Sequence, residues 1–159
     1  MHLSRRIAAV LRHPLAPYLF ALALQLVFVG YVKDDASIEY RSATNAAHGH
    51  GLVFNVGDAP VEGFTSFLWT VLLILPAWLH VPLLAVGKLA GAASLLGCIA
   101  VVAALVRARG GDERAQQLAR WLVATNASLV VWAQSGMEPV QTALAVVAAA
   151  WFLERRRPW

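Results

Sequence analysis

Two adjacent carboxylates, Asp34 and Asp35, follow Leu15–Val32, a segment without a charged residue. Charged groups are costly to hold beside an apolar environment unless they are paired or solvated. The position of the two acids therefore has two interpretations. They cap a short helix and mark the edge of a bilayer, or they belong to a site that binds a polar molecule there.

The residues after the two aspartates indicate how a polar binding site could be arranged. A helix from Asp34 to about residue 45, ended by glycines, aligns four polar side chains on one stripe that is suited to line a cleft. These side chains are those of Asp34, Arg41, Asn45 and His48. His48 and His50 also resemble a metal-binding pair. They lack a third and fourth ligand at typical spacing, so solvated loop histidines are the favoured interpretation.

Further polar residues stand among glycines and aromatic residues after this helix, and they are Asn55, Asp58, Glu62 and Thr65. This mixture favours irregular backbone that binds a polar group. Another acid, Glu138, ends the string Ser135–Glu138, which fits the S-x-x-E capping box of a helix whose first turn tolerates Pro139. Lys88 either extends its ammonium group to the membrane interface or binds an anionic lipid phosphate.

The composition places these residues beside a membrane. Of 159 residues, 59% are hydrophobic and 14% are charged, a balance far from that of an ordinary globular domain. The net charge is +4, yet the Lys and Arg residues cluster in short runs between apolar blocks. Such runs indicate membrane topology rather than a nucleic-acid-binding surface, and we expect no nucleic acid partner. The sequence therefore predicts an all-α membrane protein with about four transmembrane helices.

The apolar blocks define a single membrane module. In chain order we expect cytoplasmic residues 1–14, a span at 15–32, a large outer loop with interfacial helices at 33–80, a span at 81–106, a cytoplasmic loop at 107–114, a span at 115–134, an outer turn at 135–138, a span at 139–153 and cytoplasmic residues 154–159. The first span is an uncleaved anchor, because no cleavage site precedes Lys33. Within the third span, Asn126 and Gln134 are expected to form hydrogen bonds between helices.

The block Phe64–Leu79 is marginal as a span, because it is short and interrupted by a proline. If it lies along the outer surface or is re-entrant, only Lys88 and the basic residues of the outer loop fall outside. If it crosses, most of the Lys and Arg residues fall outside, against the positive-inside rule. We therefore expect an interfacial block, anchored by Trp69 and Trp78, with both chain ends cytoplasmic.

Four strings, taken in order, resemble those of a known family. They are D-D-A-x-I-x-x-R-x-x-x-N from Asp34, G-x-G-L-V-F-N-x-G from Gly49, V-E-G-F-T-S-x-L-W from Val61 and W-x-x-S-G-M-E from Trp132. As a series they resemble the N-terminal part of polytopic GT-C glycosyltransferases, and most closely the mycobacterial-type terminal arabinofuranosyltransferases. The resemblance covers about residues 15–153. It departs at Ser37, where an aromatic residue is expected, and at Phe64, where tyrosine is common.

The resemblance implies an enzyme of the bacterial plasma membrane whose active face is extracytoplasmic. It would transfer a sugar, with arabinofuranose as the nearest analogy, from a polyprenyl-phosphate donor to a cell-envelope glycan or another outer acceptor. Asp34 would be the catalytic acid/base centre with Asp35 beside it, and Glu138 would be the acid of a second outer loop. Arg41 and Lys88 would stabilise the phosphate leaving group. The other residues expected at the substrate are Asn45, His48, Asn55, Glu62 and Thr65.

Some relatives of this kind use a divalent cation and others do not, and we assign no metal here. The lipid-linked sugar is the donor substrate, and the glycan acceptor and the bilayer are the other partners. We expect a fragment of a longer enzyme that works with its remaining spans or with another subunit. The alternative is a non-catalytic membrane-embedded binding or assembly module, or an inactive truncated relative. An enzyme requires Asp34 and Glu138 to converge on one cavity, whereas a module does not.

Overall fold

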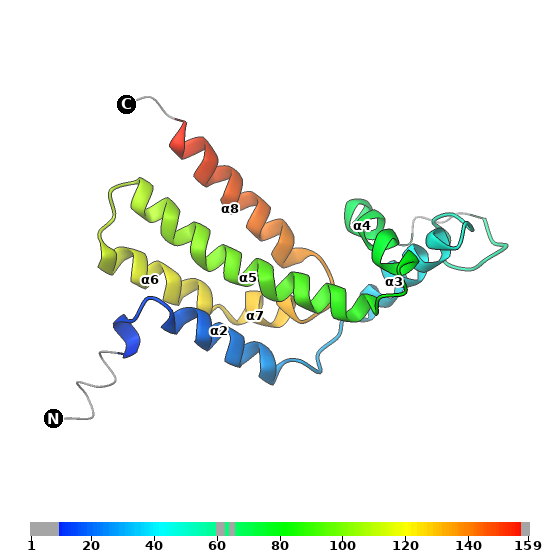
Figure 1. Ribbon diagram of the computed structural model, residues 1–159, viewed down its shortest axis with the longest axis horizontal. Helices are drawn as coiled ribbons and strands as arrows, with labels where there is room; N and C mark the ends of the chain where they lie inside the picture. The colour runs from blue at the N-terminus through cyan, green and yellow to red at the C-terminus, as the bar shows by residue number, and fades with distance from the viewer. Residues whose placement is uncertain (1–9, 60–62, 64–65, 157–159) are drawn as a thin grey trace.

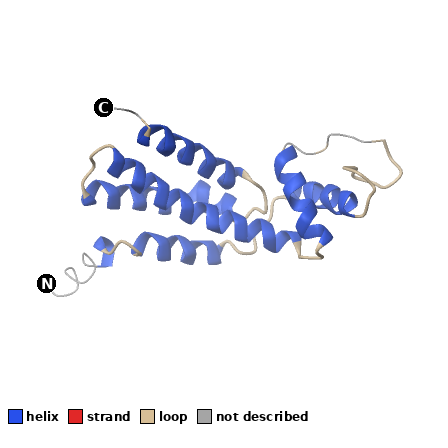
Figure 2. Cartoon of the chain, turned by 45° about the horizontal axis from the view of Figure 1, so that its top comes forward, coloured by secondary structure: helices blue, strands red, loops and turns tan. Residues whose placement is uncertain are grey.

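The structure, a computed structural model, describes residues 10–59, 63 and 66–156. The regular elements in these residues are α-helices, which confirms the all-α class. They are α2 (Ala16–Val27), α3 (Asp34–Ala47), α4 (Phe67–Trp78), α5 (Leu83–Ala108), α6 (Glu113–Ala124), α7 (Ala127–Ala133) and α8 (Pro139–Arg155). The molecule is elongated: α2, α5, α6, α7 and α8 form a bundle, and α3 and α4 form a smaller pair beyond one end of it (Figure 1). A second view shows the same separation (Figure 2).

The longest helix, α5, is the central element of the bundle and contacts α2, α6, α7 and α8. Its residues Leu95 and Ile99 are fully buried in the main core. Two glycines allow a close approach to α5. A Cβ at Gly91 would overlap the backbone of Ala133, and one at Gly87 would lie 2.6 Å from the Gly136 carbonyl oxygen. Small residues of this kind allow tight helix packing, so α5 fixes the position of the turn that follows α7.

The pair of α3 and α4 has a small core of its own around Ala43, Trp69 and Leu73. The expectation that Trp69 anchors the chain at an interface is wrong, because its side chain is only 8% exposed and packs in this core. Trp78, at the end of α4, is 63% exposed. The pair therefore has a closed apolar centre and keeps one large aromatic side chain outside.

The expected third span at 115–134 is broken in the structure. α6 ends just before Asn126, whose side-chain oxygen accepts a hydrogen bond from Leu129 N at 3.0 Å at the start of α7. Asn126 is therefore a helix N-cap rather than a bridge between helices. Gln134 does bridge helices as expected, since its Nε2 donates to Gln25 Oε1 of α2 at 2.8 Å.

Among the described residues, α5 is the one helix that is long and apolar enough to cross a membrane, judged by length and composition alone. α2 and α4 are apolar but shorter. The first expected span, 15–32, is helical over α2 and then turns before α3 begins. The helices thus establish the all-α class, while the four-span arrangement stays a prediction.

Candidate functional site: Glu39 and Glu138 between α3 and α8

The segment that carries the two aspartates is a helix, as predicted, and α3 begins at Asp34. Lys33 is its N-cap and makes no side-chain cap bond, so the interpretation of the aspartates as caps is wrong. Asp34 and Asp35 occupy the first turn, where the helix dipole favours negative charge. Both are exposed, and Asp35 Oδ2 lies 4.0 Å from the Lys33 ammonium nitrogen. The two carboxylates therefore face the surroundings rather than a closed site.

Two hydrogen bonds tie α3 to the turn between α7 and α8. Lys33 N donates to Ser135 O at 3.1 Å, and Tyr40 Oη donates to Gly136 O at 2.6 Å. Burial and the nearby charge of Glu39 raise the pKa of Tyr40 to about 12, so its hydroxyl keeps the proton that it donates. The two bonds lay the turn along α3 and bring Glu138 close to this helix.

Glu39 is the acid that this packing buries. Its side chain is 1% exposed, and neither carboxyl oxygen has a hydrogen-bond partner among the described residues. Burial, followed by the charges of Glu138 and Asp35, raises the pKa of Glu39 from 4.5 to about 7. At neutral pH the group is therefore divided between its charged and its neutral form.

Glu138 lines a cavity of about 170 Å³ between α4 and the start of α8. Trp69 of α4 and Gln141 of α8 are also part of its wall. Glu138 Oε2, Trp69 Nε1 and both polar atoms of the Gln141 amide are buried without a hydrogen-bond partner in the described part of the chain. Because unpartnered buried polar atoms are costly and rare, this cluster favours a polar ligand that satisfies donors and acceptors together.

The predicted capping box at Ser135–Glu138 does not form. α8 begins at Pro139, the expected place for proline, and Glu138 is the N-cap residue without a side-chain cap bond. Ser135 Oγ instead donates to Trp132 O at 2.7 Å and accepts from Met137 N at 3.1 Å. The Glu138 side chain makes no cap bond and instead lines the cavity.

Three residues of the predicted stripe line a second cavity. Arg41, Asn45 and His48 border a space of about 510 Å³ between α3, the end of α4 and the start of α5. Asp34 is not among the residues that line it. The predicted convergence of Asp34 with Glu138 is likewise not seen, because Asp34 does not line the cavity of Glu138. An enzyme would then need another acid in place of Asp34. The candidate is Glu39, whose pKa the charge of Glu138 raises, although Glu39 does not line that cavity.

The loop after α3 folds back on the second cavity. Arg41 donates to Asn55 Oδ1 at 2.8 Å and lies 4.5 Å from the centroid of the Phe54 ring. Asn45 Nδ2 donates to the carbonyl oxygens of Val53 at 2.8 Å and Phe54 at 3.1 Å. Asn45 thus holds the loop, and Asn55 orients Arg41. Because a guanidinium group has five N–H donors, Arg41 retains donors for an anion.

His80 lines the same cavity, although no sequence signal pointed to it. It adopts φ = 57° just after α4, where Val81 N donates to Pro76 O at 2.9 Å in a Schellman motif that usually has glycine at this position. The His80 and His48 ring centroids are 6.4 Å apart. His48 Nδ1 lies 2.8 Å from Thr44 O, so Nδ1 carries a hydrogen and Nε2 is left for a ligand.

The other residues predicted at the substrate lie elsewhere. Lys88 Nζ donates to the carbonyl oxygens of Val29 and, at 3.0 Å, Tyr31. Lys88 thereby fastens the link between α2 and α3 to α5. Glu62 and Thr65 lie outside the described residues.

The described residues contain no group of three or more His, Cys, Asp or Glu side chains that could hold a metal ion. Glu39 and Glu138 are a pair, whereas hard divalent cations take about six or more oxygen ligands. These acids therefore do not make up a cation site on their own.

The residues that sequence reasoning missed are Glu39, Gln141 and His80. A signal existed for Glu39, which follows Asp35 by one helical turn and shares a helix face with Ala36 and Ala43. Both alanines are 0% exposed, and such a face of small residues is typical of a packed surface. Gln141 and His80 have no local signal, because only the packing of α3, α4 and α8 gives them their surroundings.

Comparison of the chain with models of protein families, with curated proteins and with solved structures finds no match in any of the three. The GT-C resemblance therefore remains a prediction, and the acids and cavities described above are the physical basis for a function.

Proposed function

We propose that the chain is the N-terminal module of a membrane glycosyltransferase that moves a sugar from a polyprenyl-phosphate donor to an extracytoplasmic glycan acceptor. The observation that carries the proposal is Glu138 in a cavity with unpartnered polar atoms, together with the buried Glu39, whose pKa the charge of Glu138 raises. The hydroxyl groups of a sugar can both donate and accept hydrogen bonds, as Gln141 and Trp69 require. Arabinofuranose is the nearest analogy for the sugar.

Glycosyl transfer needs a base, because an acceptor hydroxyl attacks the anomeric carbon well only as it loses its proton. The bond from the acceptor oxygen to that carbon forms while the bond to the phosphate oxygen breaks, and the phosphate leaves with the electron pair. A carboxyl group with a pKa near the working pH is suited to take the proton. We assign this role to Glu39, with Glu138 as the neighbouring charge. Asp34, the acid that the resemblance implies, is the rival base.

The leaving lipid phosphate is already a stable anion, so a nearby cation helps it more than a proton donor does. Arg41 supplies a cation on α3, two residues after Glu39, and Asn55 holds its guanidinium group. The cavity that Arg41 lines contains two histidines and no acid among its lining residues. Its apolar lining residues Val81 and Leu84 are both exposed and suit a prenyl chain.

The proposed place of the enzyme is the bacterial plasma membrane, with α3 and α4 at the outer face. α5 has 26 residues, which at about 1.5 Å per residue extend over roughly 39 Å, enough to cross the apolar layer. Large exposed apolar side chains on other bundle helices, such as Leu26 at 73% and Leu153 at 66%, suit contact with lipid. Arginines end α5 and α8 at the bundle end opposite α3 and α4 (Figure 1), in line with the positive-inside rule. We propose α2, α5, α6 with α7, and α8 as the four crossings.

Transfer of a labelled pentose from its polyprenyl phosphate tests the proposal, in membranes that contain the chain with any downstream part of its natural protein. Glu39→Gln is expected to abolish transfer, and Glu138→Gln to reduce it and to shift its pH profile. Asp34→Asn tests the rival base, and the distant Glu113→Gln is the matched control. An active Glu39→Gln variant with an inactive Asp34→Asn variant would return the base to Asp34. If the unmodified protein transfers no sugar, the non-catalytic module becomes the better description.

A further inference from the structure

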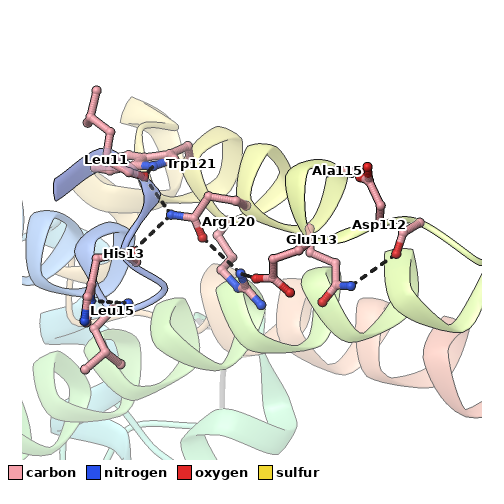
Figure 3. A network of polar contacts seen from close by, with 11 residues as sticks. Leu11, His13, Leu15, Asp112, Glu113, Ala115, Arg120 and Trp121 are labelled. Atoms are coloured by element: carbon pink, nitrogen blue, oxygen red, sulfur yellow. Dashed lines mark hydrogen bonds and ion pairs between the residues drawn. The ribbon is translucent and has the colours of Figure 1, made fainter. Parts of the chain in front are cut away.

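A polar network at the opposite end of the bundle holds the start of the described chain against α6 (Figure 3). Gln117 Nε2 donates to Leu11 O at 2.9 Å and to His13 O at 3.1 Å. Trp121 Nε1 donates to Leu11 O at 3.0 Å. The carbonyl groups on both sides of Arg12 are thus held by one side-chain amide, which fixes the backbone from which the Arg12 side chain extends.

The same network neutralises the nearest acid. Arg120 Nη1 lies 2.8 Å from Glu113 Oε1 and also donates to Gln117 Oε1 at 2.9 Å, as the dashed lines in Figure 3 show. Arg120 has a side chain that is only 13% exposed, so the Glu113 carboxylate has a well-placed partner. Gln117 is therefore bonded at both ends of its amide, and Glu113 is already balanced by a positive charge.

Arg12 and Arg114 line a cavity of about 340 Å³ at this place, together with Glu113, Gln117 and Leu118. Neither Arg12 nor Arg114 forms an ion pair or a hydrogen bond with another described residue through its side chain. Two guanidinium groups at one cavity, whose one acid among the described lining residues is already paired, are suited to bind an anion. Planar guanidinium groups bind phosphate oxygens in a bidentate manner, which favours phosphate over a simple halide.

An apolar surface borders the two arginines. Leu118 is 61% exposed and lines the cavity, Leu122 one turn later on α6 is 63% exposed, and Leu15 is 57% exposed. A free phosphate ion gains nothing from contact with this apolar surface, whereas a phospholipid has acyl chains near its phosphate that can cover it.

Three other described arginines at this end have partners. Arg109 binds Glu154 at 3.1 Å, and Arg155 and Arg156 lie over the rings of Trp151 and Phe152. They contribute positive charge near the bundle end, and this charge attracts an anionic membrane surface. Arg12 and Arg114 differ from them because they share a cavity.

We propose that the cavity of Arg12 and Arg114 binds the phosphate of an anionic glycerophospholipid, with the acyl chain along Leu118 and Leu122. This site is separate from the carboxyl pair and does not depend on glycosyl transfer. Gln117 is a positioning residue in it, because it holds the backbone of Arg12 and need not touch the lipid.

Lipid retention measured by native mass spectrometry tests the proposal. The protein is equilibrated in mixed micelles with equal phosphatidylglycerol and phosphatidylcholine, and the excess lipid is then removed. The unmodified protein is expected to retain phosphatidylglycerol, and Arg12→Gln with Arg114→Gln to lower that retention by at least about tenfold. Arg107→Gln, at the end of α5 and outside the cavity, is the matched control and should retain it. Retention should fall as salt rises.

Two further variants separate positioning from charge and from folding. Gln117→Ala keeps both arginines and is expected to weaken retention several-fold, while Arg12→Lys with Arg114→Lys should keep part of it. Equal retention in the double Gln variant and the unmodified protein would overturn the proposal. Displacement of phosphatidylglycerol by inorganic phosphate alone at equal concentration would overturn it too, because the site would then serve free phosphate.

Discussion

Replacement of Glu39 by glutamine should change how stability depends on pH. The Glu39 carboxyl has a pKa of about 7 in the folded protein against 4.5 for the free side chain. Below pH 4.5 it is protonated in both states, and the pKa difference then has no effect on unfolding. As pH rises from 4.5 to 7, the unfolded chain releases the proton while the folded chain retains it, so the free energy of unfolding falls. Above pH 7 the loss is complete.

The magnitude follows from the size of the shift. A pKa difference of about 2.5 units corresponds to roughly 3 kcal/mol at about 1.4 kcal/mol per unit. Glu39→Gln has no such titration, so its stability relative to the unmodified protein should rise by about 3 kcal/mol between pH 4.5 and pH 8. Because both pH values use the same two proteins, the cost of burying a glutamine amide cancels in this double difference.

The assay is chemical unfolding in mild detergent micelles, followed by tryptophan fluorescence at pH 4.5 and pH 8. Thr70→Val, a buried substitution without a titrating group, is the control, because it should change stability by the same amount at both pH values. A double difference under about 1 kcal/mol for Glu39→Gln would mean that water or another group satisfies Glu39, and the assignment of a proton-accepting role would lose its basis.

Three other changes should alter the melting temperature measured by circular dichroism. His80→Gly is expected to stabilise the protein by up to about 1 kcal/mol, because glycine favours the positive φ at the end of α4; a lower melting temperature would contradict the Schellman geometry. Gly91→Ala should destabilise it by about 1–3 kcal/mol or more, because the new Cβ overlaps the Ala133 backbone, whereas Gly30→Ala meets nothing within 4 Å and should have little effect. Asn126→Ala should cost about 1 kcal/mol through loss of the α7 cap, and Asn126→Ser should restore most of it.

The helix that begins at Asp34 illustrates what local sequence can predict. Its start, its approximate end and the shared cavity of Arg41, Asn45 and His48 follow from helical periodicity. These features depend on spacing within one helix, which needs no knowledge of other elements.

The proximity of Glu39 and Glu138 illustrates what local sequence cannot predict. Glu39 is buried where α3 packs on α4 and where Tyr40 and Lys33 attach α3 to the turn before α8. The break between α6 and α7 was missed for another reason. The apolar residues of 121–133 outweigh the polar residues earlier in 115–134, so an average over the segment hides a cap that the single residue Asn126 provides.

The Gln117 side chain needs both its length and the orientation of its amide group to make its hydrogen bonds. The oxygen of its amide accepts from a guanidinium group, and the nitrogen donates to two carbonyl groups. Glutamate has nearly the same size, but its carboxylate has no donor and cannot make the second set of bonds. Deamidation of this side chain would place an oxygen against the carbonyls of Leu11 and His13. His13 O would lose its donor, while Trp121 Nε1 would still donate to Leu11 O. The position of the Arg12 backbone thus depends in part on the difference between one NH₂ group and one oxygen, a chemical change that leaves the shape of the side chain almost unchanged.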